Sequence, residues 1–192
     1  MPHKLPIPPT DRDGFRFRGG HVALDLTATL AARAKAEPRE LLSQPAELQR
    51  WLVSAGLPTR GATEADLREA RQLREAVYAL ALERIAGTEV AAARETINRI
   101  ASEAPALPQL QSDGSIVLSG SAAAMLSTIA REAITLLGAG PAIQIRQCEA
   151  DGCSLLFVDS SRRGDRRWCS MAGCGNRAKL ADFRRRQREK AG

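Results

Sequence analysis

The strongest periodic pattern in the chain is an apolar stripe between residues 63 and 86. Its apolar positions recur at the spacing of one helix face. Thr63 is a residue type favoured at a helix N-cap, and Gly87 is a type favoured just after a helix end. We therefore predict a helix over 63–86, with one apolar stripe made of Leu67, Ala70, Leu73, Val77, Leu80, Ala81 and Ile85.

Shorter patterns on either side predict further helices, and one stretch predicts a β-hairpin. Alternating runs flank Asp113-Gly114 within 107–120, and this dipeptide favours a two-residue turn. A short strand is also predicted around 15–18. The predicted helices cover 21–34, 45–57, a stretch from about 88 to 104, and 121–137.

The pattern changes after the GAGP segment at 138–141, which ends the last of these helices. Two strands are predicted over 142–148 and 154–159, then an Arg-rich loop over 160–167 and a final helix. We therefore divide the chain into a flexible lead-in at 1–13, a helical domain at 14–140 and a small domain at 141–192. The fold class is mainly α (α+β), a helical bundle with one hairpin plus the small module.

All four cysteines lie in that small module, with the spacing C-x4-C-x15-C-x4-C. Two cysteine pairs separated by a gap of this length indicate a four-thiolate zinc site, with Cys148, Cys153, Cys169 and Cys174 as ligands. All four coordination positions come from the protein, so the expected zinc ion is structural. Two disulfides and an iron–sulfur cluster are the alternatives. The order of strand, turn, hairpin, turn and helix predicts a treble-clef-like module.

Charge is divided unevenly along the chain. The protein has 192 residues and a formal net charge of +6. The last 32 residues carry +8 and the first 160 carry −2. Because Arg binds phosphate through a planar fork of donors, this basic end predicts a nucleic-acid surface. The candidate contacts are Arg162, Arg163, Arg166, Arg167, Arg177, Lys179, Arg184, Arg185 and Arg188.

A helical wheel sorts the final helix into two faces. Arg184 and Arg188 each fall within about 20° of the direction of Arg177, which makes a single Arg stripe. Leu180 and Phe183 form an apolar edge, which we expect to dock on the hairpin of the zinc module. Near the cysteines, we expect Trp168 to pack beside the metal and Asp159 to pair with an Arg of the loop.

Several sequence segments resemble a known pair of domains. CGNR at 174–177, RRWCSMAG at 166–173 and the C-x4-C-x-x-LFVDSS pattern resemble the CGNR zinc-finger family. The N-terminal part resembles the ABATE domain that accompanies it, through GGHVALDLTAT at 19–29, LLSQPAELQRWLVSAGL at 41–57, LREAVYAL at 73–80, Asn98 and IRQC at 145–148. One departure is Ala28, where the family commonly has Asn. The resemblance implies a bacterial stress-induced transcription regulator with zinc in the four-cysteine site.

These observations lead to a zinc-dependent DNA-binding regulator in the cytoplasm as the first hypothesis. The helical domain would then sense a small-molecule effector or form a homodimer, with Asp25, Arg74 and Asn98 as a weak candidate pocket. The alternatives are a zinc-stabilised module that docks an acidic protein partner, and RNA binding. We predict no enzyme, because residues 14–140 contain no GxSxG, P-loop, HExxH or Rossmann glycine pattern. No signal peptide or membrane span is predicted.

Overall fold

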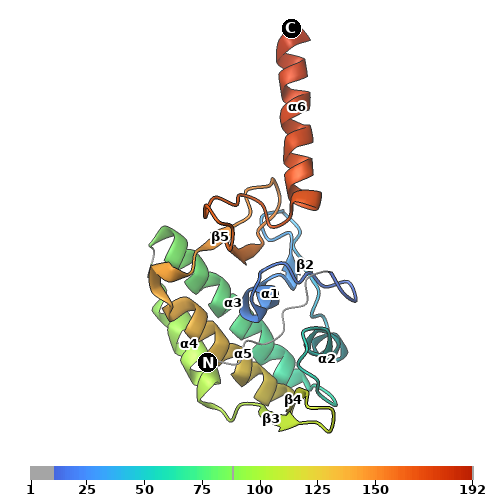
Figure 1. Ribbon diagram of the computed structural model, residues 1–192, viewed down its shortest axis with the longest axis vertical. Helices are drawn as coiled ribbons and strands as arrows, with labels where there is room; N and C mark the ends of the chain where they lie inside the picture. The colour runs from blue at the N-terminus through green and yellow to red at the C-terminus, as the bar shows by residue number, and fades with distance from the viewer. Residues whose placement is uncertain (1–10, 88, 192) are drawn as a thin grey trace.

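The computed structural model describes residues 11–87 and 89–191, so most of the predicted lead-in lies outside the described residues. Helices α3, α4 and α5 lie side by side, and α1 packs across α3 and α5 (Figure 1). Helix α2 lies on α3 at the edge of this group. The helices of this body are α1 (Val22–Thr27), α2 (Pro45–Ser54), α3 (Glu64–Ala86), α4 (Ala91–Ser102) and α5 (Ala122–Gly138).

Helix α3 confirms the prediction for 63–86, and its ends show why. The Asp66 carboxylate accepts from the backbone N–H of Thr63 at 2.8 Å, and the Thr63 hydroxyl accepts from the backbone N–H of Asp66 at 3.2 Å. This reciprocal capping box satisfies N–H groups that have no partner within the helix. Gly87 ends the helix with φ +80°, a left-handed conformation that glycine adopts without steric cost.

The core of the body is built mainly from aliphatic side chains. Trp51 is fully buried and stacks on Phe17 with ring centroids 6.1 Å apart. Alanines such as Ala70, Ala130 and Ala133 are fully buried between helices, where their small size lets the helix backbones approach closely. This explains how a chain with 4% aromatic residues encloses a continuous core.

The helix predicted over 21–34 is wrong in length, because α1 ends at Thr27. Beyond it, the short strand β1 (Leu30–Ala31) pairs with β2 (Arg39–Glu40). The buried hydroxyls of Thr27 and Thr29 donate to backbone carbonyls three residues earlier, at 2.7 Å each. Such side-chain bonds offer the backbone an alternative to continued helix. The predicted strand around 15–18 is reduced to an isolated bridge between Arg12 and Phe15.

The predicted hairpin is present, but its turn differs. Strands β3 (Leu107–Leu110) and β4 (Ile116–Ser119) pair antiparallel, and Gln111 donates to the carbonyl of Ser115 at 2.8 Å. Three residues, 112–114, therefore form the loop in place of the predicted two. Gly114 at φ +80° takes the left-handed position that a three-residue loop requires.

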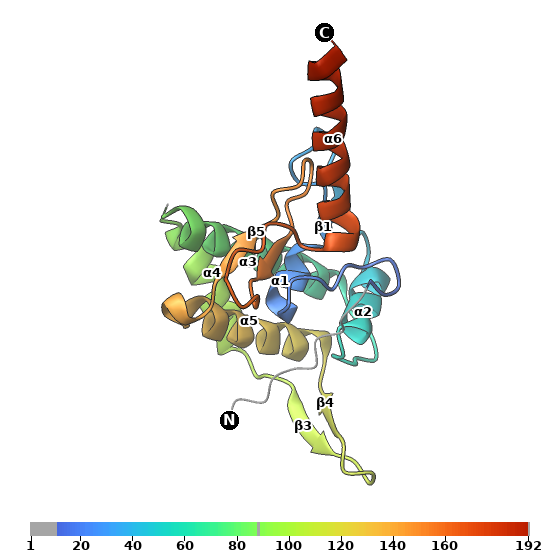
Figure 2. The same ribbon diagram turned by 45° about the horizontal axis from the view of Figure 1, so that its top comes forward.

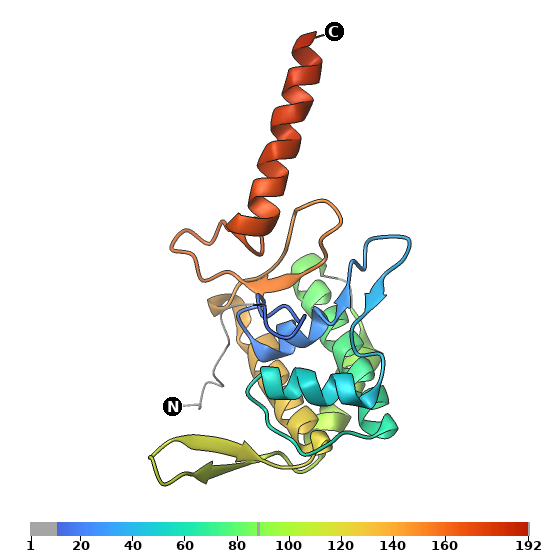
Figure 3. The ribbon, with the colours of Figure 1, turned by 90° about the vertical axis from the view of Figure 1, so that its right-hand side faces the viewer.

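The C-terminal module begins after a 3-10 turn, Gly140–Ala142 (η1), and contains strands β5 (Ile145–Gln147) and β6 (Leu156–Val158). Ile145 and Leu156 are buried in the same apolar cluster as the helical body. The final helix α6 (Asn176–Ala191) follows a single π turn, Met171–Gly175 (η2), and projects away from the rest of the molecule (Figures 1 and 3). No helix in the described part of the chain has the length and apolar character to cross a membrane.

Candidate metal centre and basic surface

The structure brings the four predicted cysteines together at one point. Cys148 follows strand β5, and Cys153 lies in the turn before β6. Cys169 follows the Arg-rich loop, and Cys174 lies in η2 just before α6. Their sulfur atoms all lie within 4.8 Å of one another, and Cys148, Cys169 and Cys174 are buried.

This geometry fits one tetrahedral zinc ion. Zn–S bonds of about 2.3 Å place tetrahedral sulfurs about 3.8 Å apart, and Sγ of Cys169 lies 3.5 Å from Sγ of Cys174. That separation is far beyond a disulfide bond, and all four cysteines are free. An iron–sulfur cluster would distribute the thiolates over several irons and hold them farther apart. The four thiolates therefore bind one structural zinc, which holds strand, loop and helix together.

Backbone and side-chain donors also converge on these sulfurs. The backbone N–H of Cys169 donates to Sγ of Cys148 at 3.3 Å, and the Arg177 guanidinium donates to Sγ of Cys174 at 3.1 Å. Hydrogen bonding to Cys174 raises the pKa of Arg177 above its ordinary value. Arg177 thus stays fully cationic and partly neutralises the thiolate charge, so one side chain of the predicted Arg stripe also braces the metal centre.

A small second core supports the metal site. It joins the cysteines to Phe157 and Trp168, and Ala28 at the end of α1 belongs to it as well. The predicted place of Trp168 beside the metal is confirmed. Ala28, the position that departs from the family pattern, therefore packs against the zinc module.

Arg166 holds the loop that carries Cys169. It donates to the carbonyls of Trp168, at 2.9 Å, and Cys169, and its guanidinium lies 4.5 Å from the Phe157 ring centroid. With its guanidinium engaged by these groups, Arg166 is a structural residue of the loop. Its prediction as a nucleic-acid contact has no support from this placement.

Asp159 has a different partner from the one expected. Its buried carboxylate lies 3.0 Å from Nε of Arg146 on strand β5. It also accepts from the backbone N–H of Arg166 at 2.9 Å and from the Ser161 hydroxyl at 2.6 Å. Asp159 therefore ties the Arg-rich loop to β5 through the loop backbone and not through a loop Arg side chain.

The other predicted contacts lie on the surface of the module. Arg167 is engaged by Glu149 at 2.6 Å, and Arg185 is engaged by Asp182 at 3.0 Å. Among the side chains that the structure describes, none forms an ion pair with Arg184 or Arg188. The exposed members of the set are Arg162, Arg163, Arg167, Arg177, Lys179, Arg184, Arg185 and Arg188.

The expected docking of α6 is wrong. Leu180 is 49% exposed and Phe183 is 55% exposed, so the apolar edge is not covered by the hairpin. Helix α6 contacts the η2 turn at its start and then runs outward (Figure 3).

The three residues of the weak candidate pocket lie in different surroundings. Asp25 is buried in α1 and accepts from the backbone N–H of Gly19 at 2.7 Å. Arg74 is buried in α3 and pairs with Glu40 through two bonds, of 2.6 and 2.7 Å. Asn98 is exposed on α4 and lines a surface pocket whose lining includes neither of the others.

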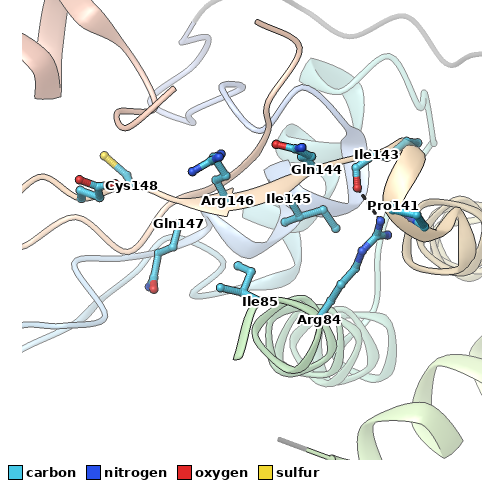
Figure 4. A pocket seen from close by; sticks show the side chains of 10 residues that line it. Arg84, Ile85, Pro141, Ile143, Gln144, Ile145, Arg146, Gln147 and Cys148 are labelled. Atoms are coloured by element: carbon cyan, nitrogen blue, oxygen red, sulfur yellow. Dashed lines mark hydrogen bonds between the residues drawn. The ribbon is translucent and has the colours of Figure 1, made fainter. Parts of the chain in front are cut away.

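Arg84, which the sequence did not single out, joins the two parts of the chain. Its guanidinium donates to the carbonyls of Leu136, at 2.8 Å, and Leu137, at 3.1 Å, and also to those of Gly140 and Ile143. Figure 4 shows this side chain reaching from α3 to the segment that leads into β5. Carbonyl acceptors leave no mark in the sequence, so only the fold reveals this role.

Comparisons with known proteins agree with the geometry. A family model named ABATE, described as "Putative stress-induced transcription regulator", matches residues 20–140. A second, the CGNR zinc finger, matches residues 144–187, which include all four cysteines. A search of curated proteins finds no match. The chain belongs to the ABATE family and carries a zinc-binding CGNR finger after its ABATE domain.

Proposed function

We propose that this protein is a DNA-binding transcription regulator that presents α6 to the duplex. One observation carries the proposal: α6 stands free of the body and carries an Arg stripe that includes Arg184 and Arg188. Neither of these two has an acidic partner among the described side chains. Uncompensated Arg on a protruding helix is suited to phosphate contacts, which supply most of the affinity in protein–DNA binding.

The dimensions of α6 support this use. The helix has 16 residues, which corresponds to a length of about 24 Å. A single α-helix fits the major groove, which is about 12 Å wide. Cys174 lies in the η2 turn directly before α6, so the zinc site holds the segment from which α6 starts. Arg162 and Arg163 in that loop are exposed and add positive charge to the same module.

We assign the protein a regulatory role in the cytoplasm and no catalytic step. The regulatory role agrees with the description of its family. Zinc stabilises the module and takes no part in chemistry. The helical body carries the module and provides the remaining surface for interactions.

The test is the salt dependence of duplex binding, measured by fluorescence anisotropy with a random-sequence duplex. We expect submicromolar affinity at low salt and a log–log slope of several units. Replacing Arg184 and Arg188 with Ala should reduce that slope by about two, because each phosphate contact releases about one counterion. The exposed Arg68→Ala and Arg99→Ala pair on the body serves as the matched control and should leave the slope unchanged. Absence of duplex binding at about 50 mM salt contradicts the proposal.

A second candidate function is docking to an acidic protein, and the exposed Leu180 and Phe183 favour it. A helix with an apolar edge between Arg residues fits an apolar groove with acidic rims. The Leu180→Ala, Phe183→Ala variant separates the two functions. Duplex affinity that is unchanged in this variant supports phosphate binding, whereas lost capture of an acidic partner supports docking. Single-stranded RNA as a competitor in the same assay tests the RNA alternative.

A further inference from the structure

One side chain reaches the metal centre from outside the zinc module. Arg18 lies in the segment before α1, and neither family match, at 20–140 or at 144–187, includes it. A Cβ atom added at Gly173 would lie only 3.2 Å from Nη1 of Arg18. Because Gly173 directly precedes Cys174, this guanidinium lies against the turn that carries the last of the four zinc ligands.

The backbone next to Arg18 is held from two sides. The N–H of Gly19 donates to the buried Asp25 carboxylate of α1 at 2.7 Å. The carbonyl of Gly19 accepts from the backbone N–H of Val158 on β6 at 2.8 Å. Helix α1 packs against β6, and Figure 2 shows it next to the module from which α6 rises. The position of Arg18 is therefore set jointly by α1 and by the zinc module.

The Asp11 carboxylate orients the Arg18 guanidinium. Nε and Nη2 of Arg18 donate to its two oxygens, at 2.8 and 2.6 Å. A pair of parallel bonds of this kind fixes the plane of the guanidinium. Nη1 is the nitrogen that remains, and it has no hydrogen-bond partner among the described residues. It is also the nitrogen that lies next to Gly173, so the unpaired end of the cation faces the metal-binding turn.

The charge of Arg18 lies close to an anionic site. Four thiolates outweigh the charge of one zinc ion, so the loaded centre is negative. Burial lowers the pKa of Arg18, but the bonds to Asp11 and the charges of Cys169 and Cys174 outweigh this effect and raise the pKa above its ordinary value. Arg177 donates to Cys174 from α6. Two arginines from distant parts of the chain therefore act on the same thiolates.

We propose that Arg18 is a positioning residue of the zinc centre, which slows zinc loss by stabilising the anionic thiolates of Cys169 and Cys174. Groups around the ligands of a metal tune its affinity, and their loss typically weakens binding about 10- to 100-fold. The zinc site is then shared between the module and the segment before α1. Neither Arg184 nor Arg188 takes part, so the role of Arg18 does not depend on the proposed DNA binding.

The test is the rate at which a chromophoric chelator removes zinc from the full zinc-loaded chain. Arg18→Met should release zinc roughly 10-fold faster than the wild type, because the side chain keeps its aliphatic part and loses its charge. Arg18→Gln, which keeps a polar donor without the charge, should behave in the same way. Arg18→Lys should restore a rate near that of the wild type. Arg12→Met, an exposed change in the same segment, is the matched control and should leave the rate unchanged.

Two further readouts separate a charge effect from a packing effect. The difference in zinc release between the wild type and Arg18→Met should shrink as salt rises from about 0.05 to 1 M, because salt screens a partly exposed charge. With cobalt(II) in place of zinc, the thiolate-to-cobalt charge-transfer band should move to lower energy in Arg18→Met, since a nearby cation stabilises the sulfur electrons. Arg12→Met should show neither change.

Three results would overturn the inference. The first is equal zinc release by the wild type and by both neutral variants of Arg18. The second is an Arg18→Lys protein that loses zinc as fast as Arg18→Met. The third is a difference between wild type and Arg18→Met that is the same at all salt concentrations. Circular dichroism of the zinc-loaded variants checks that each one is folded before the rates are compared.

Discussion

Asp25 illustrates how a single buried residue is held in this fold. One carboxylate oxygen accepts from Gly19, while the other has no hydrogen-bond partner among the described residues. Burial disfavours the charged form and raises the pKa of Asp25 to about 7, although the bond from Gly19 acts in the opposite direction. Arg74, also buried, is instead paired with Glu40 and Glu75. Buried charge is therefore paired at Arg74, whereas the Asp25 carboxyl keeps its proton up to near neutral pH.

The pKa of Asp25 predicts a pH-dependent stability. The folded protein keeps the proton up to about pH 7, whereas the unfolded chain releases it near pH 4. The contribution is therefore full below about pH 4 and is lost as the pH rises through about 7. Relative to wild type, Asp25→Asn should gain roughly 3 to 4 kcal/mol of unfolding free energy between about pH 4 and pH 8.

Urea titrations of the two proteins across this range measure the difference. Zinc release at low pH affects both proteins alike, so the comparison isolates Asp25. Asp165→Asn, an exposed change in the Arg-rich loop, is the control. If the unfolding free energies of the wild type and Asp25→Asn differ by the same amount at every pH, the raised pKa of Asp25 is contradicted.

At the scale of elements, α3 and α6 are stabilised in different ways. Helix α3 is formed by local signals, an apolar stripe and a capping box. Beyond the first turn of α6, every side chain that the structure describes is exposed, so this helix lacks the buried face that stabilises most helices. Cys174, which lies two residues before its start at Asn176, belongs to the metal centre. We therefore expect α6 to depend on zinc, whereas α3 does not.

Removing a zinc ligand tests this dependence. Cys148→Ser should lose the single zinc ion per chain in elemental analysis and should lose helical circular dichroism from α6. The helices of the body should persist, because their core excludes the four cysteines. Asp151→Ser, an exposed change in the same loop, is the matched control. Full helicity in a metal-free Cys148→Ser protein would refute the dependence.

At the scale of the whole molecule, the two domains are joined by shared packing. Ile145 and Leu156 of the zinc module lie in the large core, and Gln147 donates to the Tyr78 hydroxyl of α3 at 3.1 Å. Arg84 adds two bonds to the end of α5, at Leu136 and Leu137, and two to the connecting segment, at Gly140 and Ile143. The module is thereby held against the body, and α6 projects from it.

Loss of Arg84 should loosen this junction. Arg84→Met removes donors to four carbonyls and is expected to cost about 2 to 3 kcal/mol, because bonds from a charged donor are among the stronger ones. Hydrogen exchange should quicken at residues 143–147 before it does in α3. Arg99→Met, which breaks an exposed pair with Glu69, is the control and should cost under about 1 kcal/mol. Equal exchange rates in β5 of the wild type and Arg84→Met would count against the junction role.

The sequence by itself determined the features that depend on local or chemical signals. The sequence predicts the apolar stripe and caps of α3, the paired cysteines and the basic C-terminal end. Helix periodicity, ligand spacing and charge can be recognised without knowledge of distant contacts. The resemblance to the two families rested on similarly local segments.

Only the tertiary structure decided where each element ends and how the elements are placed relative to one another. Helix α1 stops at Thr27 and is followed by the pairing of Leu30–Ala31 with Arg39–Glu40, and α6 projects from the body with Leu180 and Phe183 exposed. Arg166 turned inward to carbonyls and Arg84 clamped the junction, although both look like ordinary surface charges in the sequence. The Arg84 bonds join groups 52 to 59 positions apart in the chain, and no local pattern records that these groups will meet.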